Sequence, residues 1–205
     1  MTIIRFFDWF QLAVLLVMAC LAFGRAFTLY SRGVRVVVID RERSVGRTLV
    51  DLLTVVCFVV WVYEVAAHTW PLRTHFVPEP LGAVLIDVTA IKILGAVLLM
   101  SGPVIYSLAL VAMGSSWRLG IDRNSHGRLV TGGIFRWSRN PIYIALDCLA
   151  LGVFLIQGRL VFLALAAFLI GTLHDQILYE ERFLSRAYGD TYRDYCRRVG
   201  RYVKA

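Results

Sequence analysis

The chain has 205 residues, of which 59% are hydrophobic and 18% charged, and its formal net charge is +8. This apolar content exceeds that of an ordinary soluble domain, so we expect a bilayer to be the solvent of the chain. The basic residues lie between apolar runs, which favours contact with anionic lipid headgroups and argues against nucleic acid as a partner. Four widely spaced cysteines without a CxxC pair argue against a disulfide framework or a thiolate metal site.

Two apolar runs in the first third of the chain predict membrane-spanning helices. They cover Phe10 to Tyr30 and Leu49 to Ala67, and each is close to the ~20 residues that cross the hydrocarbon core. The residues before the first run make a poor signal peptide, so we expect this span to be retained. On the second span, Glu64 and His68 lie one helical turn apart, and we expect a local hydrogen bond at the membrane interface rather than a functional site.

A third apolar region extends from Leu81 to Met113. Asp87 and Lys92 in its first part predict an interfacial lead-in, so the membrane-spanning core is expected from Ile93 to Met113. The Gly102-Pro103 pair inside this span predicts a kink, which neighbouring helices can accommodate.

The last two apolar runs are short and adjacent. They cover Ile142 to Ile156 and Leu160 to Leu173, and the few residues between them predict a helical hairpin. A polar, amphipathic segment from Glu180 to Ala205 ends the chain.

Arginines are distributed unevenly over the connections between these spans. Residues 31–47 and 114–140 carry five each and residues 180–205 carry six, whereas each intervening connection carries one. With five spans, the positive-inside rule places the N-terminus outside and the three basic segments, including the C-terminus, in the cytosol. The sequence therefore predicts an all-α polytopic membrane protein.

The segment LVTGGIF, from Leu129 to Phe135, contains two adjacent glycines. Glycine lets the backbone approach a ligand closely and expose its N–H donors. A turn before a helix explains the same two glycines, so both interpretations stay open at this point.

The segment RNPIY, from Arg139 to Tyr143, precedes the expected hairpin. Pro141 suits the first turn of a helix, and Asn140 can cap that helix. Asn140, Tyr143 and Asp147 fall on one helical face. Because Asp147 lies inside an apolar run, it indicates either a functional site or a structural hydrogen bond to Ser or Tyr.

Polar residues interrupt the second helix of the hairpin towards its predicted cytosolic end. His174 and Glu181 are seven residues apart and share a face, whereas the adjacent Glu180 and Glu181 cannot both point at one ligand. His75 and His126 lie in loops without further ligands nearby, so we expect no metal site.

Taken in order, LVTGGIF, RNPIY, the short hairpin, YEERFL and YGDTYRDYCRRV resemble the catalytic half of isoprenylcysteine carboxyl methyltransferases and related membrane phospholipid methyltransferases. The resemblance covers residues 114–203. It implies a catalytic region over residues 114–205, after a three-span membrane region over residues 1–113. It also implies a helical methyltransferase without a Rossmann domain, whose cofactor S-adenosylmethionine binds a cytosol-facing pocket between the loop and the hairpin.

Carried over onto this sequence, the resemblance gives a set of expected cofactor contacts, to which we add His174 because it shares a face with Glu181. The set is Leu129, Val130, Thr131, Gly132, Gly133, Ile134, Phe135, Asn140, Pro141, Tyr143, His174, Glu180 and Glu181. Asn140 departs from the family pattern, because the eukaryotic enzymes have His at this position of their Arg-His-Pro-x-Tyr motif. Asn cannot titrate near neutral pH, so it cannot act there as a base.

Methyl transfer from a sulfonium depends mainly on holding the acceptor near the methyl group with water excluded. We expect Arg139 and Glu180 to be the catalytic residues, since a carboxylate suits a cationic cofactor and an arginine suits a carboxylate acceptor. Arg136 is the second choice for binding the acceptor, and Asp147 is a further candidate substrate contact.

The favoured function is O-methylation of a lipophilic carboxylate, with a lipophilic or lipidated substrate and membrane lipids as the partners. The first alternative is a phospholipid N-methyltransferase, whose amine acceptor would not need Arg139. Two further alternatives are an NADPH-dependent sterol-reductase-like protein and a non-catalytic membrane binding protein.

Overall fold

The computed structural model describes residues 3–33, 44–70, 78–117 and 129–203. These residues form helices α1 (Ile3–Tyr30), α2 (Val45–Thr69), α3 (Thr89–Met113), α4 (Pro141–Gln157), α5 (Leu160–Tyr188) and α6 (Asp190–Arg198), with 3-10 turns η1 (Glu79–Gly82), η2 (Gly114–Ser116) and η3 (Gly133–Arg136). Among the described residues the only β-type pairing is an isolated bridge between Val84 and Arg159. The predicted all-α class is confirmed.

Four of the helices, α1, α2, α3 and α5, are long and apolar enough to cross a membrane. A helix of 25 residues, such as α2 or α3, is roughly 37 Å long, which exceeds the ~30 Å of hydrocarbon. Helix α4 is also apolar but has 17 residues, close to the lower limit of roughly 17 for a span. All five predicted apolar helices are therefore present, and four of them have the length of a full span.

The helix boundaries differ from the predicted ones in one important place. Helix α5 does not end near Leu173 but continues through Tyr188, so the expected cytosolic segment begins inside a helix. The reason is tertiary: the last turns of α5 make polar contacts with the start of α4 and pack against α6. Helices α1 and α3 also begin several residues earlier than expected, at Ile3 and Thr89.

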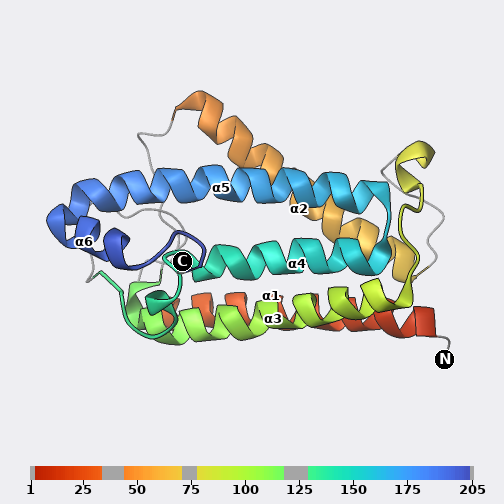
Figure 1. Cartoon of the computed structure of the whole chain (residues 1–205), viewed down its shortest axis with the longest axis horizontal. Helices are drawn as coiled ribbons and strands as arrows, with labels where there is room; N and C mark the ends of the chain where they lie inside the picture. The colour runs from red at the N-terminus through yellow and green to blue at the C-terminus, as the bar shows by residue number, and fades with distance from the viewer. Residues whose placement is uncertain (1–2, 34–43, 71–77, 118–128, 204–205) are drawn as a thin grey trace.

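The long helices run alongside one another (Figure 1). Helices α3, α4 and α5 are antiparallel neighbours, α1 lies against α3, and α2 crosses obliquely and contacts α5. Helix α6 folds back at the end of α5. The N-terminal end of α1 and helix α6 therefore lie at opposite ends of the molecule.

Glycines bring the backbones of α3 and α4 into direct contact. A methyl group added at Gly152 would lie 2.8 Å from the backbone nitrogen of Leu99 and 2.9 Å from the carbonyl oxygen of Gly95. Small residues at such an interface let two membrane helices approach closely. Pro103 lies within α3, which continues unbroken to Met113, and the expected kink stays a prediction.

The turn between α4 and α5 is fastened to the segment that precedes α3. Gly158 adopts a φ of +61°, and its carbonyl oxygen accepts hydrogen bonds from the backbone nitrogens of Leu85 and Ile86 at 2.7 and 3.0 Å. A side chain at this glycine would collide with the carbonyl of Ile86. The predicted hairpin is thus confirmed, and its turn is held by the lead-in to α3.

The same end of the molecule contains the Glu64–His68 pair. The Nδ1 atom of His68 lies 2.8 Å from the backbone oxygen of Glu64 and 3.7 Å from its carboxylate. The local hydrogen bond that the spacing predicts is confirmed. Asp87 and Lys92, the expected interfacial lead-in, form an ion pair of 2.5 Å that lowers the pKa of Asp87.

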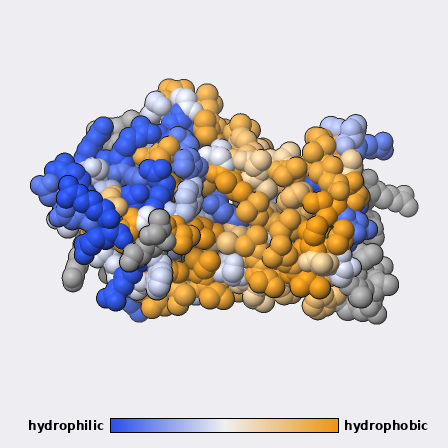
Figure 2. All heavy atoms as spheres, in the orientation of Figure 1, coloured by the Kyte–Doolittle hydropathy of each residue, from blue (hydrophilic) through white to orange (hydrophobic). Residues whose placement is uncertain are grey.

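Hydrophobic residues cover the middle of the face shown in Figure 2, and hydrophilic residues gather at the end formed by α6 and the last turns of α5. Large apolar side chains on the helices are exposed, among them Phe23, Phe27, Val55 and Val111. Lipid favours such a surface because the apolar side chains avoid water, and it tolerates the helices because they satisfy their own backbone hydrogen bonds. The protein is an integral membrane protein, and its orientation stays a prediction.

Candidate functional site

The hydrophilic end of the molecule brings the start of α4 against the last turns of α5. The hydroxyl of Tyr143 donates a hydrogen bond to Oε1 of Glu180 at 2.6 Å. Gln176, one turn earlier on α5, donates to the same oxygen at 3.1 Å. Glu180 thus belongs to a network that joins the two helices of the hairpin.

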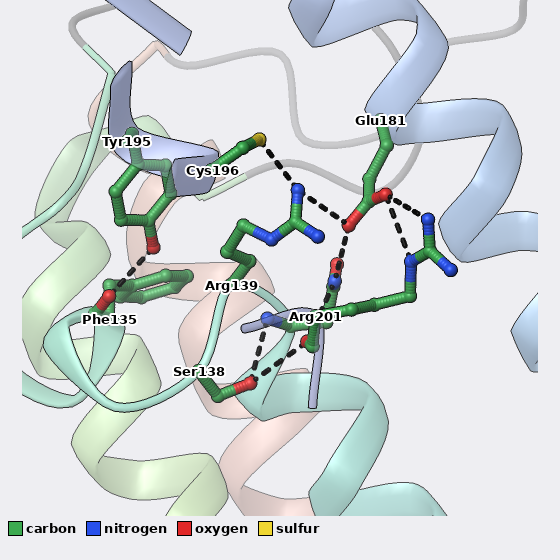
Figure 3. Close-up of polar contacts among 8 residues, drawn as sticks. Phe135, Ser138, Arg139, Glu181, Tyr195, Cys196 and Arg201 are labelled. Carbon is green, nitrogen blue, oxygen red and sulfur yellow. Dashed lines mark hydrogen bonds and ion pairs between the residues drawn. The ribbon is translucent and has the colours of Figure 1, made fainter. Parts of the chain in front are cut away.

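Glu181 is buried and has a different set of partners (Figure 3). Arg201 donates from Nε and Nη2 to one carboxylate oxygen, at 3.0 and 2.9 Å. The other oxygen accepts from Nδ2 of Asn140 at 3.2 Å and lies 3.4 Å from Nη1 of Arg139. The two adjacent carboxylates therefore face different groups, and Glu181 is surrounded by donors.

Asn140 occupies the N-cap position of α4, but its side chain makes no capping hydrogen bond, so the predicted cap is wrong. The amide nitrogen Nδ2 donates instead to Glu181 and, at 3.1 Å, to the backbone oxygen of Arg201. A cap would use the amide oxygen as an acceptor, so the charge-assisted hydrogen bond from Nδ2 to Glu181 acts by orienting the side chain away from the capping position. Pro141 lies in the first turn of α4, as the sequence predicts.

The segment after α6 completes the site. The backbone nitrogen of Arg139 donates to the carbonyl oxygen of Gly200 at 3.1 Å, and the hydroxyl of Ser138 donates to that of Arg201 at 3.3 Å. Tyr202 forms a hydrogen bond of 2.5 Å with Nδ1 of His174, and the two rings are stacked. His174 therefore reaches the site through the C-terminal segment.

Helix α6 connects the glycine loop to the rest of the site. Tyr192 and Tyr195 are buried on its inner face, where Leu129 packs against them. The hydroxyl of Tyr195 donates to the backbone oxygen of Phe135 at 2.7 Å, and burial raises the pKa of Tyr195 to about 12. Phe135 is buried, Leu129, Val130, Thr131 and Ile134 are half-buried, and Gly132 and Gly133 are exposed.

A cavity of about 510 Å³ opens between α5, α6 and the C-terminal segment. Its lining includes two of the predicted residues, Arg139 and Glu181, together with Tyr192, Cys196 and Arg201. The other predicted residues do not line the cavity: the glycine loop, Arg136, Asn140, Pro141, Tyr143, Asp147, His174 and Glu180. Arg136 is exposed. The geometry thus joins Arg139 to Glu181 and separates Arg136 from them.

The cavity is lined by basic, acidic, hydroxyl and thiol side chains. Arg139 donates to the sulfur of Cys196 at 2.6 Å, next to its contact with Glu181. The buried hydroxyl of Tyr192 has no oxygen or nitrogen partner among the described residues and lies near the Cys196 thiol. A buried hydroxyl with so weak a partner is free to bond a ligand. Burial also raises the pKa of Tyr192, so it is a neutral donor.

Asp147 lies one turn further along α4 than Tyr143. Its Oδ1 atom is buried and has no hydrogen-bond partner among the described residues, so the alternative of a structural hydrogen bond finds no support at this atom. Burial and the charge of Asp147 raise the pKa of Tyr202 in the C-terminal segment. In the part of the chain that the structure describes, no group of three His, Cys, Asp or Glu residues could hold a metal ion.

Sequence reasoning missed Tyr192, Tyr195, Cys196, Arg201 and Tyr202. The tyrosines of YGDTYRDYCRRV recur every three or four residues, which indicates an amphipathic helix with a buried face. Arg201 and Tyr202 gave no such signal, because their positions depend on how the chain returns to α4 and α5.

One comparison with known proteins gives a match. The family model for phospholipid methyltransferases matches residues 90–191, which extend from the first turn of α3 into α6 and contain half of the residues that line the cavity. A search of curated proteins finds no match. Residues 90–191, just under half of the chain, are thus similar to the phospholipid methyltransferases, a family of membrane methyltransferases related to the isoprenylcysteine carboxyl methyltransferases.

Proposed function

We propose that the protein transfers a methyl group from S-adenosylmethionine to a lipophilic acceptor at one face of a membrane. The observation that supports this best is the cavity of about 510 Å³ at the hydrophilic end of the matched region. Its volume falls in the usual range for small-molecule sites, roughly 300 to 1,000 Å³.

The residues around the cavity fit the cofactor chemically. S-adenosylmethionine supplies a methyl group on a sulfonium and carries an ammonium, a carboxylate and an adenosyl group. Glu181 offers a negative charge for a cation, Arg139 offers a positive charge for the carboxylate, and Tyr192 offers an aromatic ring and a donor hydroxyl. The weakly partnered hydroxyl of Tyr192 is the atom that a bound ligand would best explain.

The protein's own contribution is positioning. The network of Tyr143, Glu180 and Gln176 holds α4 and α5 at a fixed separation next to the cavity. The segment after α6 covers the same end through its contacts with Ser138 and Asn140. Holding acceptor and methyl group near contact, away from water, accounts for most of the rate in this kind of displacement.

For the acceptor we propose a lipid amine. Asp147 supports it, because a half-buried carboxylate whose Oδ1 atom is buried and unpartnered attracts an ammonium group and can take its proton before the nitrogen attacks. In the balanced step a nitrogen–carbon bond forms, the carbon–sulfur bond breaks, and the sulfonium becomes a neutral thioether. The phospholipid methyltransferase description points the same way. Arg139 supports the second candidate, a carboxylate acceptor, although its guanidinium already contacts Glu181 and Cys196.

Cofactor binding is tested by calorimetry of the detergent-solubilised protein with S-adenosylhomocysteine. Binding is expected, and no binding at millimolar ligand would overturn the proposed function. A radiolabelled methyl-transfer assay over membrane extracts then identifies the product. Radiolabel that alkali does not release indicates an amine, and label released as methanol indicates an ester.

Two substitutions separate the acceptor classes. At saturating S-adenosylmethionine and with an amine acceptor, Asp147→Asn is expected to lower kcat/KM for the acceptor by about 100-fold or more, because a charge partner and base is lost, while Arg139→Gln has the smaller effect. A carboxylate acceptor reverses this order. Asp175→Asn is the matched control, since Asp175 is a carboxylate on α5 that is already paired, with Arg47. S-adenosylhomocysteine affinity should be retained in Asp147→Asn.

A further inference from the structure

Arg201 stands between Glu181 and any cation that enters the cavity. Two nitrogens of its guanidinium donate to a single oxygen of Glu181, at 3.0 and 2.9 Å (Figure 3). This pairing raises the pKa of Arg201 and neutralises the carboxylate. A cofactor cation that uses Glu181 must therefore compete with Arg201.

Arg201 is also the partner of Glu181 that can leave most easily. Its side chain is 37% exposed, whereas those of Glu181 and Arg139 are 10% and 13% exposed. Arg139 is further held by the sulfur of Cys196. When the guanidinium of Arg201 turns into solvent, Glu181 keeps its contacts with Arg139 and Asn140.

The backbone of the same segment is held independently of this side chain. The carbonyl oxygen of Arg201 accepts from Ser138 and Asn140, and that of Gly200 accepts from Arg139. Tyr202 is bonded and stacked on His174. Movement of the Arg201 side chain therefore requires no unfolding of the segment.

The other arginines that line the cavity are not equivalent to Arg201. Arg193 and Arg197 pair with Asp190 and Asp194 on their own helix. Arg182 donates to the backbone of its own helix. Among the described residues, Arg201 alone makes a two-nitrogen contact with Glu181.

We propose that Arg201 is a positioning residue, which holds Glu181 in the ligand-free protein and releases it to the cationic group of the cofactor. In this exchange of partners at Glu181, only the side chain of Arg201 moves, and the backbone of the segment after α6 stays in place. The inference rests on the proposed function, because it assumes that the cavity receives S-adenosylmethionine.

The test compares Arg201→Gln with the unmodified protein by calorimetry, using S-adenosylmethionine and S-adenosylhomocysteine. Removing the competitor should tighten binding of at least one ligand by about tenfold, the gain expected when one charged hydrogen-bond partner no longer has to be displaced. A gain confined to S-adenosylmethionine assigns the sulfonium as the competing group, and a gain for both ligands assigns the ammonium. Arg198→Gln is the matched control, because Arg198 is an exposed α6 arginine that does not line the cavity.

Glu181→Gln, alone and combined with Arg201→Gln, completes a double-mutant cycle. In that background Arg201→Gln should give no further gain, because the carboxylate for which the groups compete is absent. A purely structural Arg201 would instead weaken both ligands when substituted. Unchanged or weaker binding in Arg201→Gln overturns the inference.

Arg201→Lys keeps a positive charge but loses the two-nitrogen contact, so it serves if the glutamine variant does not fold. It should bind more tightly than the unmodified protein and less tightly than Arg201→Gln, and affinity at or below that of the unmodified protein contradicts the exchange. Failure of the unmodified protein to bind either ligand counts against the proposed function itself. If the unmodified protein binds the ligands but the affinities of the Arg201 variants do not change, the exchange is wrong and the proposed function stands.

Discussion

Asn140 illustrates how one side chain can serve a different purpose from the one its position favours. By local sequence preference alone, an Asn that directly precedes a proline at the start of a helix is a good N-cap. The amide instead donates to Glu181 and to the carbonyl oxygen of Arg201, so it joins α4, α5 and the C-terminal segment. The choice between the two roles is decided by a carboxylate that lies 41 residues away along the chain.

Asn140→Asp separates these two roles. Asp caps helices as well as Asn does, so a capping residue would tolerate the change. Because Asn140 lies 3.2 Å from a carboxylate oxygen of Glu181, the new charge should destabilise the protein by about 2–3 kcal/mol. Thermal unfolding in detergent measures the loss, and lowering the pH towards 5 should recover part of it. An unchanged unfolding temperature at neutral pH would contradict the observed contact.

The apolar helices could be predicted from local sequence, whereas the polar helical segments could not. The apolar runs of α1 to α4 predict helices because hydrocarbon leaves the backbone no other way to satisfy its hydrogen bonds. The hairpin follows from the short connection at Gly158. The continuation of α5 to Tyr188 and the fold of α6 could not be predicted in this way, because polar segments gain their structure from tertiary contacts such as Tyr195 with Phe135.

The candidate site could also be predicted in part. The motifs RNPIY and YEERFL indicate Arg139, Asn140 and Glu181, and these three residues do lie together. They meet because the hairpin brings the start of α4 against the end of α5. Arg136 is only three residues from Arg139 but is exposed, because η3 turns it away from the cavity. Spacing along the chain could not distinguish the two arginines.

The contact between α3 and α4 gives a prediction at the level of helix packing. In Gly152→Ala, the new methyl group would lie 2.8 Å from the backbone nitrogen of Leu99, and backbone atoms cannot move away as a side chain can. We expect a loss of about 1–3 kcal/mol in the free energy of unfolding, measured by thermal unfolding in detergent. Gly171→Ala in α5 is the control, because no atom lies within 4 Å of that position. Equal effects of both changes would show that α3 and α4 are not in close contact.

At the scale of the whole molecule, the polar groups are concentrated at one end. The cavity, α6 and the C-terminal segment gather there, and the apolar middle separates them from η1 and the Glu64–His68 pair (Figure 2). In the proposed reaction, a lipid acceptor would reach this end from the bilayer, while a water-soluble cofactor would reach it from the adjacent solution. The membrane scaffold would then bring the two substrates together.

The positive-inside rule assigns the end with α6 to the cytosol, and labelling of introduced cysteines tests this assignment. Asp194→Cys in α6 and Glu79→Cys in η1 place exposed thiols at the two ends. Cys196 is replaced first because it lies at the tested end, whereas Cys20, Cys57 and Cys148 lie within apolar helices. A membrane-impermeant maleimide should label Glu79→Cys in intact cells and Asp194→Cys only after the membrane is opened. The opposite pattern would place the cavity outside, where S-adenosylmethionine is not supplied by the cytosol, and would count against the proposed reaction as well as the orientation.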